Sequence, residues 1–310
     1  MSLGTAWNTL AKLLTGRAVP IVERDRTSGG LKAADSILPV PEPLAGKAPN
    51  AVRLHSGAGT LAAVGDIEGN TIELGDNITL RGTIKGQGNV IRIAGTKNPR
   101  VLHLELFGND NEVSIGANAL LQNPRVEIGS KRWPCSRARL RIGNGFSIAS
   151  QGRFILPNSG NVIEIGDDCM FSSNIVVRGG EYPHLIFDRT SGEFLDVSDG
   201  IFLGNHVWVG EGVFIGKSVT LPDDCIVGTR SIVTKRFEET HCVIAGNPAR
   251  IVKRDVQWVA NEYLLEQEFP LAHQRFADTE IKRINRAEAK RAKAKAATGS
   301  PAAAAQRDHR

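Results

Sequence analysis

A histidine and a tryptophan lie 24 positions apart in a chain with few aromatic residues. His184 belongs to the stretch RGGEYPHLIFDRTSGEFLDVSDG, and Trp208 belongs to GNHVWVGEG. Imidazole titrates near neutral pH, so it can take the proton from a hydroxyl that becomes a nucleophile. The indole N–H can only donate a hydrogen bond, which suits it to an oxygen that gains negative charge. Each residue alone has a plainer interpretation: a surface histidine, and an aromatic wall beside a strand.

A six-residue repeat must position these two side chains. Small or branched residues stand four places after each aliphatic one, and glycine often follows the aliphatic residue directly. A period of six fits neither an α-helix nor a plain strand. We interpret it as a parallel β-solenoid with three faces per coil, aliphatic residues inward and glycine where the backbone turns. The aliphatic positions are Leu203, Val209, Ile215, Leu221, Val227 and Val233.

The same rhythm upstream extends the predicted solenoid to residues 51–250, because Ile72, Ile78, Ile84 and Val90 also lie six apart. The segment 178–200 is too long for one hexad, and long excursions from a rigid scaffold often carry functional residues. Three segments flank the predicted solenoid. The first, within 1–50, is an N-terminal helix from Thr5 to about Gly16 followed by an irregular connector. The second is a helical cap at 251–281, with a helix from Asp255 to Glu268 stopped by Pro270. The third is a basic tail at 282–310.

Composition agrees with narrow coils: 33 of 310 residues are glycine and only 5% are aromatic. The four cysteines form no CxxC pair, and Cys169 and Cys225 occupy inward slots, so we expect buried, reduced thiols. No apolar run is long enough to cross a membrane, and we expect a cytoplasmic protein.

The positive charge belongs to the tail. Residues 282–310 hold nine Lys/Arg and two Asp/Glu, a net of +7, while the whole chain has +5, so residues 1–281 carry about −2. We interpret the tail as a solvated helix or a disordered segment. Weak contact with an anionic membrane surface is a minor alternative. No basic-aromatic constellation accompanies the tail, so we expect no nucleic-acid partner.

Three stretches within residues 160–258 resemble one known family. They are IGDDCMFSSNIVVRGGEYPH, IFLGNHVWVGEGVFIGKSVTLPDDCIVGTRSIVTK, and IAGNPARIVK with the following Trp258. Together they resemble the hexapeptide-repeat acyltransferases, and most of all those that O-acetylate sugars and surface polysaccharides such as polysialic acid. The resemblance implies an all-β, left-handed parallel β-helix with short flanking helices. General chirality rules would instead favour right-handed crossovers, in about 98% of cases.

The resemblance also implies acetyl-CoA as acyl donor, no metal, and a C3 homotrimer with sites between chains. It makes His184 the general base. Trp208 could orient the thioester or stabilise the developing oxyanion, and the backbone N–H groups at Gly210 could serve the same oxygen. The positions that match the family's CoA groove and phosphate contacts are Gly210, Gly228, Thr229, Thr234, Lys235, Arg250 and Lys253. Candidates on the acceptor side are Gln151, Arg153, Glu181 and Asp188.

Two departures from the family pattern leave questions open. Glu211 stands where relatives often have Gly or Ser, and Glu181 precedes the histidine by three positions rather than two. The group that holds the imidazole is therefore Glu181, Asp188 or a backbone carbonyl.

The expected function is O-acetylation of a carbohydrate hydroxyl, on a cell-surface or capsular polysaccharide. Alternatives are an N-acyltransferase for nucleotide amino sugars, a serine O-acetyltransferase and a non-enzymatic scaffold. The three-histidine zinc site of γ-class carbonic anhydrases does not fit the spacing of His184, His206 and His241, and we expect His206 to face solvent.

Overall fold

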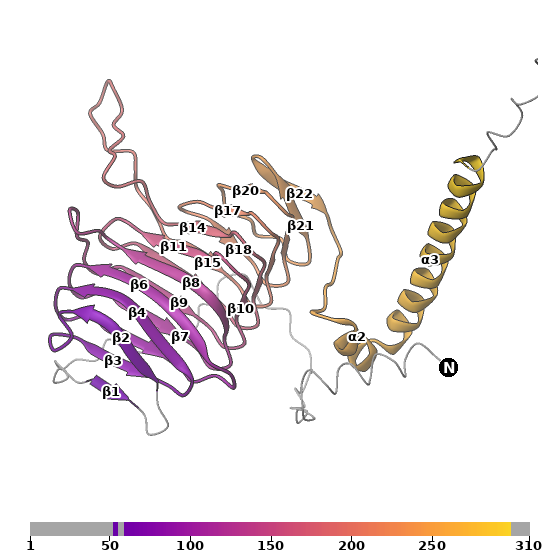
Figure 1. The fold of residues 1–310 in the computed structure, drawn as a ribbon. Helices are drawn as coiled ribbons and strands as arrows, with labels where there is room; N and C mark the ends of the chain where they lie inside the picture. The colour runs from indigo at the N-terminus through magenta and orange to yellow at the C-terminus, as the bar shows by residue number, and fades with distance from the viewer. Residues whose placement is uncertain (1–51, 55–58, 299–310) are drawn as a thin grey trace, which may run out of the picture. The chain divides into compact units, whose positions relative to one another are not determined.

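The computed structural model describes residues 52–54 and 59–298, and it forms a parallel β-solenoid with strands on three faces (Figure 1). The predicted N-terminal helix and connector lie outside these residues. Face 1 contains β1 (Val52–Leu54), β3 (Thr71–Leu74), β5 (Val90–Ile93), β7 (Glu112–Ile115), β9 (Arg139–Ile142), β12 (Val162–Ile165), β15 (Ile201–Leu203) and β18 (Thr220–Leu221).

Face 2 contains β2 (Thr60–Gly65), β4 (Ile78–Lys85), β6 (Arg100–Phe107), β8 (Leu120–Ile128), β11 (Arg153–Leu156), β14 (Val176–Arg178), β17 (Phe214–Ile215) and β20 (Ile232–Val233). Face 3 begins with the first residues of β8 and continues with β10 (Ser147–Ile148), β13 (Met170–Phe171), β16 (Trp208–Val209), β19 (Ile226–Val227), β21 (Val243–Gly246) and β22 (Ala249–Lys253).

The last coils follow the predicted hexad. Trp208 pairs with Ile226, and Phe214 pairs with Ile232, each 18 residues and therefore three hexads further along. The aliphatic residue and the residue four places later are both buried, as Leu203 and Val207 illustrate. The three-faced coil is therefore confirmed for this part of the chain.

The upstream coils differ from the prediction. There, one strand of eight residues replaces two short strands, so Ile78 and Ile84 both lie on β4. Val90 is only half-buried, and its neighbour Ile91 is the fully buried residue. The six-residue spacing at Val90 was thus misleading, because longer strands shift the inward position by one residue.

The predicted role of the hexad glycines was also wrong. Left-handed backbone with φ of 52–60° occurs at His206, Ser218 and Asp224, two places after the glycine slot. Gly204 lacks a positive φ, but a Cβ there would come within 2.1 Å of Asp223 Oδ1 in the next coil. The glycine is needed because neighbouring coils approach closely, while polar residues make the turn.

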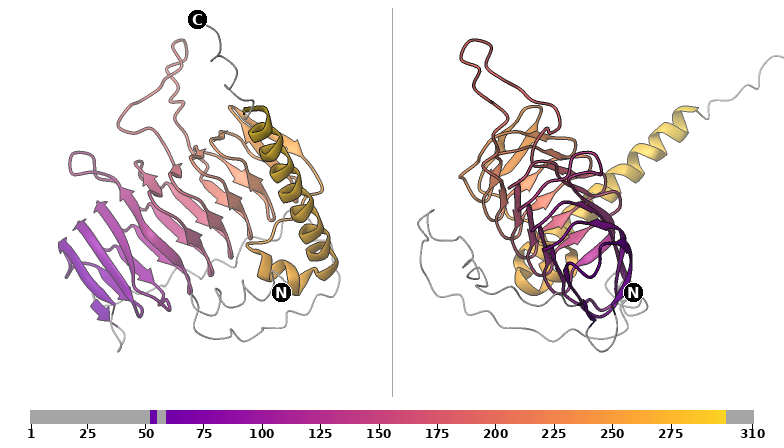
Figure 2. Two further views of the ribbon diagram at one scale, coloured as in Figure 1. Left: turned by 45° about the vertical axis from the view of Figure 1, so that its right-hand side comes forward. Right: turned by 90° about the vertical axis from the view of Figure 1, so that its left-hand side faces the viewer.

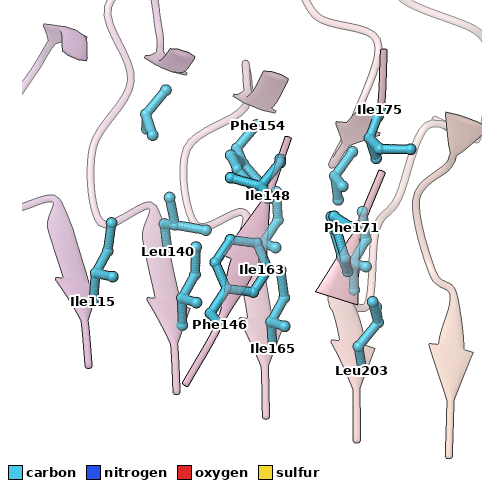
Figure 3. Close-up of a cluster of buried hydrophobic side chains, with 14 of the residues drawn as sticks. Ile115, Leu140, Phe146, Ile148, Phe154, Ile163, Ile165, Phe171, Ile175 and Leu203 are labelled. Carbon is cyan, nitrogen blue, oxygen red and sulfur yellow. The ribbon is translucent and has the colours of Figure 1, made fainter. Parts of the chain in front are cut away.

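Three phenylalanines fill the core just before the long excursion (Figure 3). Phe146, Phe154 and Phe171 are at most 2% exposed, and the Phe146 and Phe171 ring centroids lie 5.1 Å apart, edge to face. Cys169 is fully buried as predicted, and burial raises the pKa of its thiol to about 12. This tightly packed core gives the excursion a rigid base.

A ladder of buried asparagines runs along the edge between faces 2 and 1. Asn89 Nδ2 donates to Asn70 Oδ1 at 2.8 Å, and Asn111 Nδ2 donates to Asn89 Oδ1 at 2.9 Å. Further along, Asn161 Nδ2 donates to the carbonyl of Gly179, at the start of the excursion, at 3.2 Å. These amides satisfy the polar backbone of one edge over several coils.

The helix predicted from Asp255 begins later, and a second helix that was not predicted starts at Pro270. Helix α2 (Glu262–Glu268) starts after Asn261, whose side chain accepts a hydrogen bond from Leu264 N, and α3 (Pro270–Thr298) starts at the proline. Proline suits a first helical position because no N–H is needed there. The predicted helix was expected to cover the end of the coils, but the side chain of Trp258, which is 6% exposed, lies there instead. No helix in the described part is both long and apolar enough to span a membrane.

Candidate active site

The excursion at residues 179–200 leaves the solenoid between β14 on face 2 and β15 on face 1, and it projects away from the coils (Figures 1 and 2). Asp196 anchors it. This carboxylate is fully buried, forms an ion pair with Lys217 of the next coil, and accepts a hydrogen bond from the backbone N–H of Glu181 at 3.2 Å. Sequence reasoning missed Asp196 because only the fold shows which of the excursion's acidic residues is buried.

His184 lies three residues after Glu181, whose backbone N–H bonds to this anchor, and the His184 side chain is exposed. Its backbone N–H donates to the carbonyl of Glu181 at 3.1 Å. The Glu181 carboxylate instead pairs with Arg178 at 3.1 Å. Neither Glu181 nor Asp188 bonds to the imidazole in the described structure, so the group that orients His184 stays a matter of prediction.

Asp188 closes the turn at the tip of the excursion. Its Oδ1 accepts hydrogen bonds from the backbone N–H groups of Ser191 and Thr190, at 2.7 and 2.9 Å. These bonds hold the pKa of the Asp188 carboxyl below its usual range. The rings of Phe187 and Phe194 pack 5.5 Å apart across the same tip. The local role of Asp188 is therefore to hold the turn.

Trp208 lies on face 3, where its half-buried side chain points outward beside the inward Val209. Its indole Nε1 is buried and has no hydrogen-bond partner in the structure. Because a buried donor without a partner costs free energy, this N–H is suited to an acceptor atom of a ligand. The ring of Trp258 lies 5.9 Å away.

His206 is partly exposed on the outer side of its coil, as predicted, but its ring also has close contacts. Its ring stacks on Trp258 with centroids 4.0 Å apart, and its Nδ1 lies 2.8 Å from Asp224 Oδ1. The Trp258 indole N–H donates to the His206 carbonyl at 3.0 Å. His206 and Trp258 thus form a stacked pair next to Trp208, which we call the support behind Trp208. The sequence did not predict this pair, although Trp258 stood out in the stretch that resembles the family.

The predicted CoA-binding residues fall in three places. Gly210, Gly228 and Thr229 lie together on the edge between faces 3 and 2, where a Cβ on Gly210 would come within 2.8 Å of Thr229 N. Thr234 and Lys235 follow β20, at the edge that carries the excursion. Lys235 Nζ lies 5.1 Å from the ring centroid of Phe237. Arg250 and Lys253 are exposed on β22.

Of the predicted acceptor residues on the preceding coil, Gln151 is exposed with φ of 63° on the edge between faces 3 and 2. Arg153 is engaged by Glu127 in a two-pronged ion pair, with N–O distances of 2.9 and 3.0 Å. Glu211 is exposed, and its Oε1 lies 3.4 Å from Asn174 Nδ2. No group of three or more His, Cys, Asp or Glu side chains in the described residues could hold a metal ion.

Within one chain, His184 and Trp208 lie on different sides of the solenoid. His184, Thr234 and Lys235 belong to the edge between faces 2 and 1, while Trp208 and Gly210 belong to face 3 and its border with face 2. None of the hydrogen bonds or ring contacts among the described residues joins His184 to Trp208.

Comparison with known proteins gives the class. A polysialic acid O-acetyltransferase of Neisseria meningitidis is 31% identical over 202 residues, covering 58% of this chain and 89% of the relative. One of Escherichia coli O1:K1 / APEC is 30% identical over 124 residues, covering 40% of this chain and 37% of the relative. The galactoside O-acetyltransferase of Escherichia coli strain K12 is 32% identical over 108 residues, covering 34% of this chain and 52% of the relative.

No family model matches the chain. Among solved structures, the polySia-specific acetyltransferase NeuO aligns with a TM-score of 0.47 and 26% identity, covering 65% of this chain and 83% of that one. The repeat and the extent of the Neisseria match define an acetyltransferase of the hexapeptide-repeat class. Within that class, the chain belongs to the family of the polysialic acid O-acetyltransferases.

Proposed function

We propose that this acetyltransferase moves the acetyl group of acetyl-CoA to a hydroxyl of a carbohydrate, on a cell-surface or capsular polysaccharide. The observation that carries this proposal is the 31% identity across 89% of the Neisseria polysialic acid O-acetyltransferase. The aligned relatives named above act, by their names, on saccharide hydroxyls. His184 and Trp208 supply the proton acceptor and the hydrogen-bond donor that such a transfer needs.

Each residue has a defined part in the proposed step. The His184 imidazole takes the proton of the acceptor hydroxyl as its oxygen forms the new ester bond. The acyl donor supplies a thioester, whose carbon–sulfur bond breaks, and the proton then passes from His184 to the departing thiolate. The indole N–H of Trp208 stabilises the negative charge that develops on the acyl oxygen.

The structure favours Trp208 over Gly210 as the donor for this oxygen. The backbone N–H of Gly210 already donates to the carbonyl of Val227 at 2.8 Å, as part of the coil-to-coil pairing. No atom of the described residues accepts a hydrogen bond from Trp208 Nε1. We therefore assign Gly210, together with Gly228 and Thr229, to close approach by the pantetheine arm, and Arg250 and Lys253 to the CoA phosphates.

We further propose a left-handed coil and a C3 homotrimer, in which His184 of one chain meets Trp208 of the next. The separation of these residues on different sides of a single chain supports this assembly. Cyclic symmetry would repeat one such pairing three times.

A thiol-release assay with acetyl-CoA tests the proposed function. The acceptors are neutral sugars, polysialic acid, amino sugars and serine, with dextran as a polymer control. We expect release with a saccharide hydroxyl and an alkali-labile acetyl ester in the product. Acetylation of amines alone would replace this function with that of an N-acyltransferase.

A further inference from the structure

A second loop lies on the same edge as the His184 excursion and is rich in cations. Residues 129–138 connect β8 on face 2 to β9 on face 1, and we call them, together with Arg139 at the start of β9, the basic loop. The next coil needs only residues 157–161 for the same connection. All four of its charged side chains are exposed and positive. They are Lys131, Arg132, Arg137 and Arg139.

These cations lack acidic partners in the described structure. No ion pair joins any of the four to a carboxylate, and Arg132 instead lies over the ring of Trp133, 4.9 Å from its centroid. Neighbouring arginines are paired: Arg141 with Glu112 at 2.9 Å, and Arg153 with Glu127 at 2.8 Å. The contrast matters because a cation bound to a carboxylate contributes little to binding another anion, whereas an unpaired one can.

The basic loop is fixed at its base. Asn111 of the asparagine ladder donates to the Cys135 carbonyl at 3.1 Å and accepts from Ala138 N at 2.9 Å. The thiol of Cys135 is buried, which raises its pKa to about 11. A ligand that bound here would meet charges already held in place.

Hydrogen bonds connect the basic loop to the His184 excursion. Ser136 N donates to Ser159 Oγ at 3.0 Å, and Asn158 Oδ1 of the same intervening loop accepts from Tyr182 N at 3.4 Å. Two coil spacings separate the basic loop from the excursion, about 10 Å at the usual distance between neighbouring strands. A polymer with one sugar at His184 would thus reach the basic loop with the adjoining sugars.

The coils that follow the basic loop carry a net negative charge. Residues 161–230 hold four Lys/Arg and eleven Asp/Glu, a net of −7. Such coils repel an anionic polymer, so its approach to His184 needs fixed cations nearby. A neutral polysaccharide would gain nothing from the four unpaired charges.

We propose that the basic loop is a binding subsite for a carboxylate-bearing polysaccharide, and that it holds the acceptor chain while one sugar lies at His184. This proposal rests on the proposed function, and it adds a second contact for the acceptor polymer outside the His184 excursion; an acidic polymer is already the substrate in the names of the polysialic acid O-acetyltransferases. The Arg132 and Arg137 guanidinium groups hydrogen-bond the sugar carboxylates, and Lys131 adds a point charge.

A direct binding measurement tests this subsite without requiring catalysis. Labelled polysialic acid serves as the probe, with dextran as the neutral polymer. Phosphatidylserine vesicles and single-stranded DNA serve as the other polyanions. We expect Lys131→Ser/Arg132→Ser to raise the Kd for polysialic acid roughly tenfold, since charge-assisted hydrogen bonds are lost. The matched control is Arg81→Ser/Lys97→Ser, which removes the same charge from exposed residues on earlier coils, on the side of the basic loop away from the excursion. The control should change the Kd by less than about twofold.

Each outcome decides the proposal. Equal weakening in both variants would show a general effect of net charge and overturn the subsite, as would tighter binding of vesicles or DNA than of polysialic acid. The basic-loop variant should also raise KM for the polymer and leave turnover of a small neutral sugar unchanged. If no acceptor is acetylated while the two variants still differ in polymer binding, the proposed function fails and the binding subsite stands.

Discussion

At the scale of single residues, the account depends on His184 as a proton acceptor. His184→Ala should keep the fold, because the exposed side chain has no part in the buried core. Turnover should fall by roughly two to four orders of magnitude, the usual worth of positioned proton transfer. The wild-type rate should decline at acid pH as the base is protonated, and the residual activity of the variant should lack that decline. Steady-state kinetics across pH measures both effects.

CoA binding provides the control for this substitution. The residues assigned to CoA lie elsewhere, so the affinity of His184→Ala for CoA should match that of the wild type in calorimetry. A folded variant with wild-type turnover would remove His184 from the mechanism.

At the scale of elements, the anchor of the excursion is expected to set the position of His184. Asp196→Asn removes the charge that pairs with Lys217, and the remaining amide is a poorer acceptor for Glu181 N. We expect kcat to fall about tenfold to a hundredfold, because small misplacements of a catalytic group are costly, while KM for acetyl-CoA stays nearly unchanged. The wild-type pH profile should persist in the remaining activity, since His184 is still present.

Asp199→Asn is the matched control for this anchor. Asp199 lies in the same excursion and pairs with Arg236 at 2.6 Å, but its side chain is 62% exposed. Exposed ion pairs contribute little to stability, so this variant should behave as the wild type. If the two variants lose activity equally, the buried pair has no special role in positioning the loop.

The basic tail is expected to be dispensable for chemistry on small acceptors. Side chains described from Ile281 onward in α3 are exposed. Deleting residues 282–310 should change turnover of a small soluble acceptor by less than about twofold. A large loss in a truncated protein that keeps its oligomeric state would place the tail in the site.

At the scale of the whole molecule, the repeat predicted the later coils well because each hexad occupies one face of an 18-residue coil. It predicted the earlier coils less well, since long strands such as β4 replace two short strands and move the inward position from Val90 to Ile91. Local spacing also failed for contacts between coils, such as those of Gly204 and His206, which depend on residues many positions away. The helix at Asp255 was misplaced because Trp258 is used to cover the coils, and Asn261 caps the helix instead.

The sequence likewise predicted only part of the candidate site. Spacing and resemblance identified His184 and Trp208, but Asp196, the support behind Trp208 and the unpaired cations of the basic loop required the fold. These features arise from burial or from the absence of a partner, neither of which a sequence displays.

Complementation between two inactive variants tests the central claim most directly, namely that acetyl transfer takes place where His184 of one chain meets Trp208 of another. His184→Ala and Trp208→Ala chains are purified separately, unfolded, mixed in equal amounts and refolded. In random trimers, about a quarter of the sites would pair an intact His184 with an intact Trp208 from the neighbouring chain. We predict that acetyl transfer rises from near zero in either variant alone to about a quarter of the activity of refolded wild type. Mixed trimers that form but stay as inactive as the separate variants would contradict the shared site.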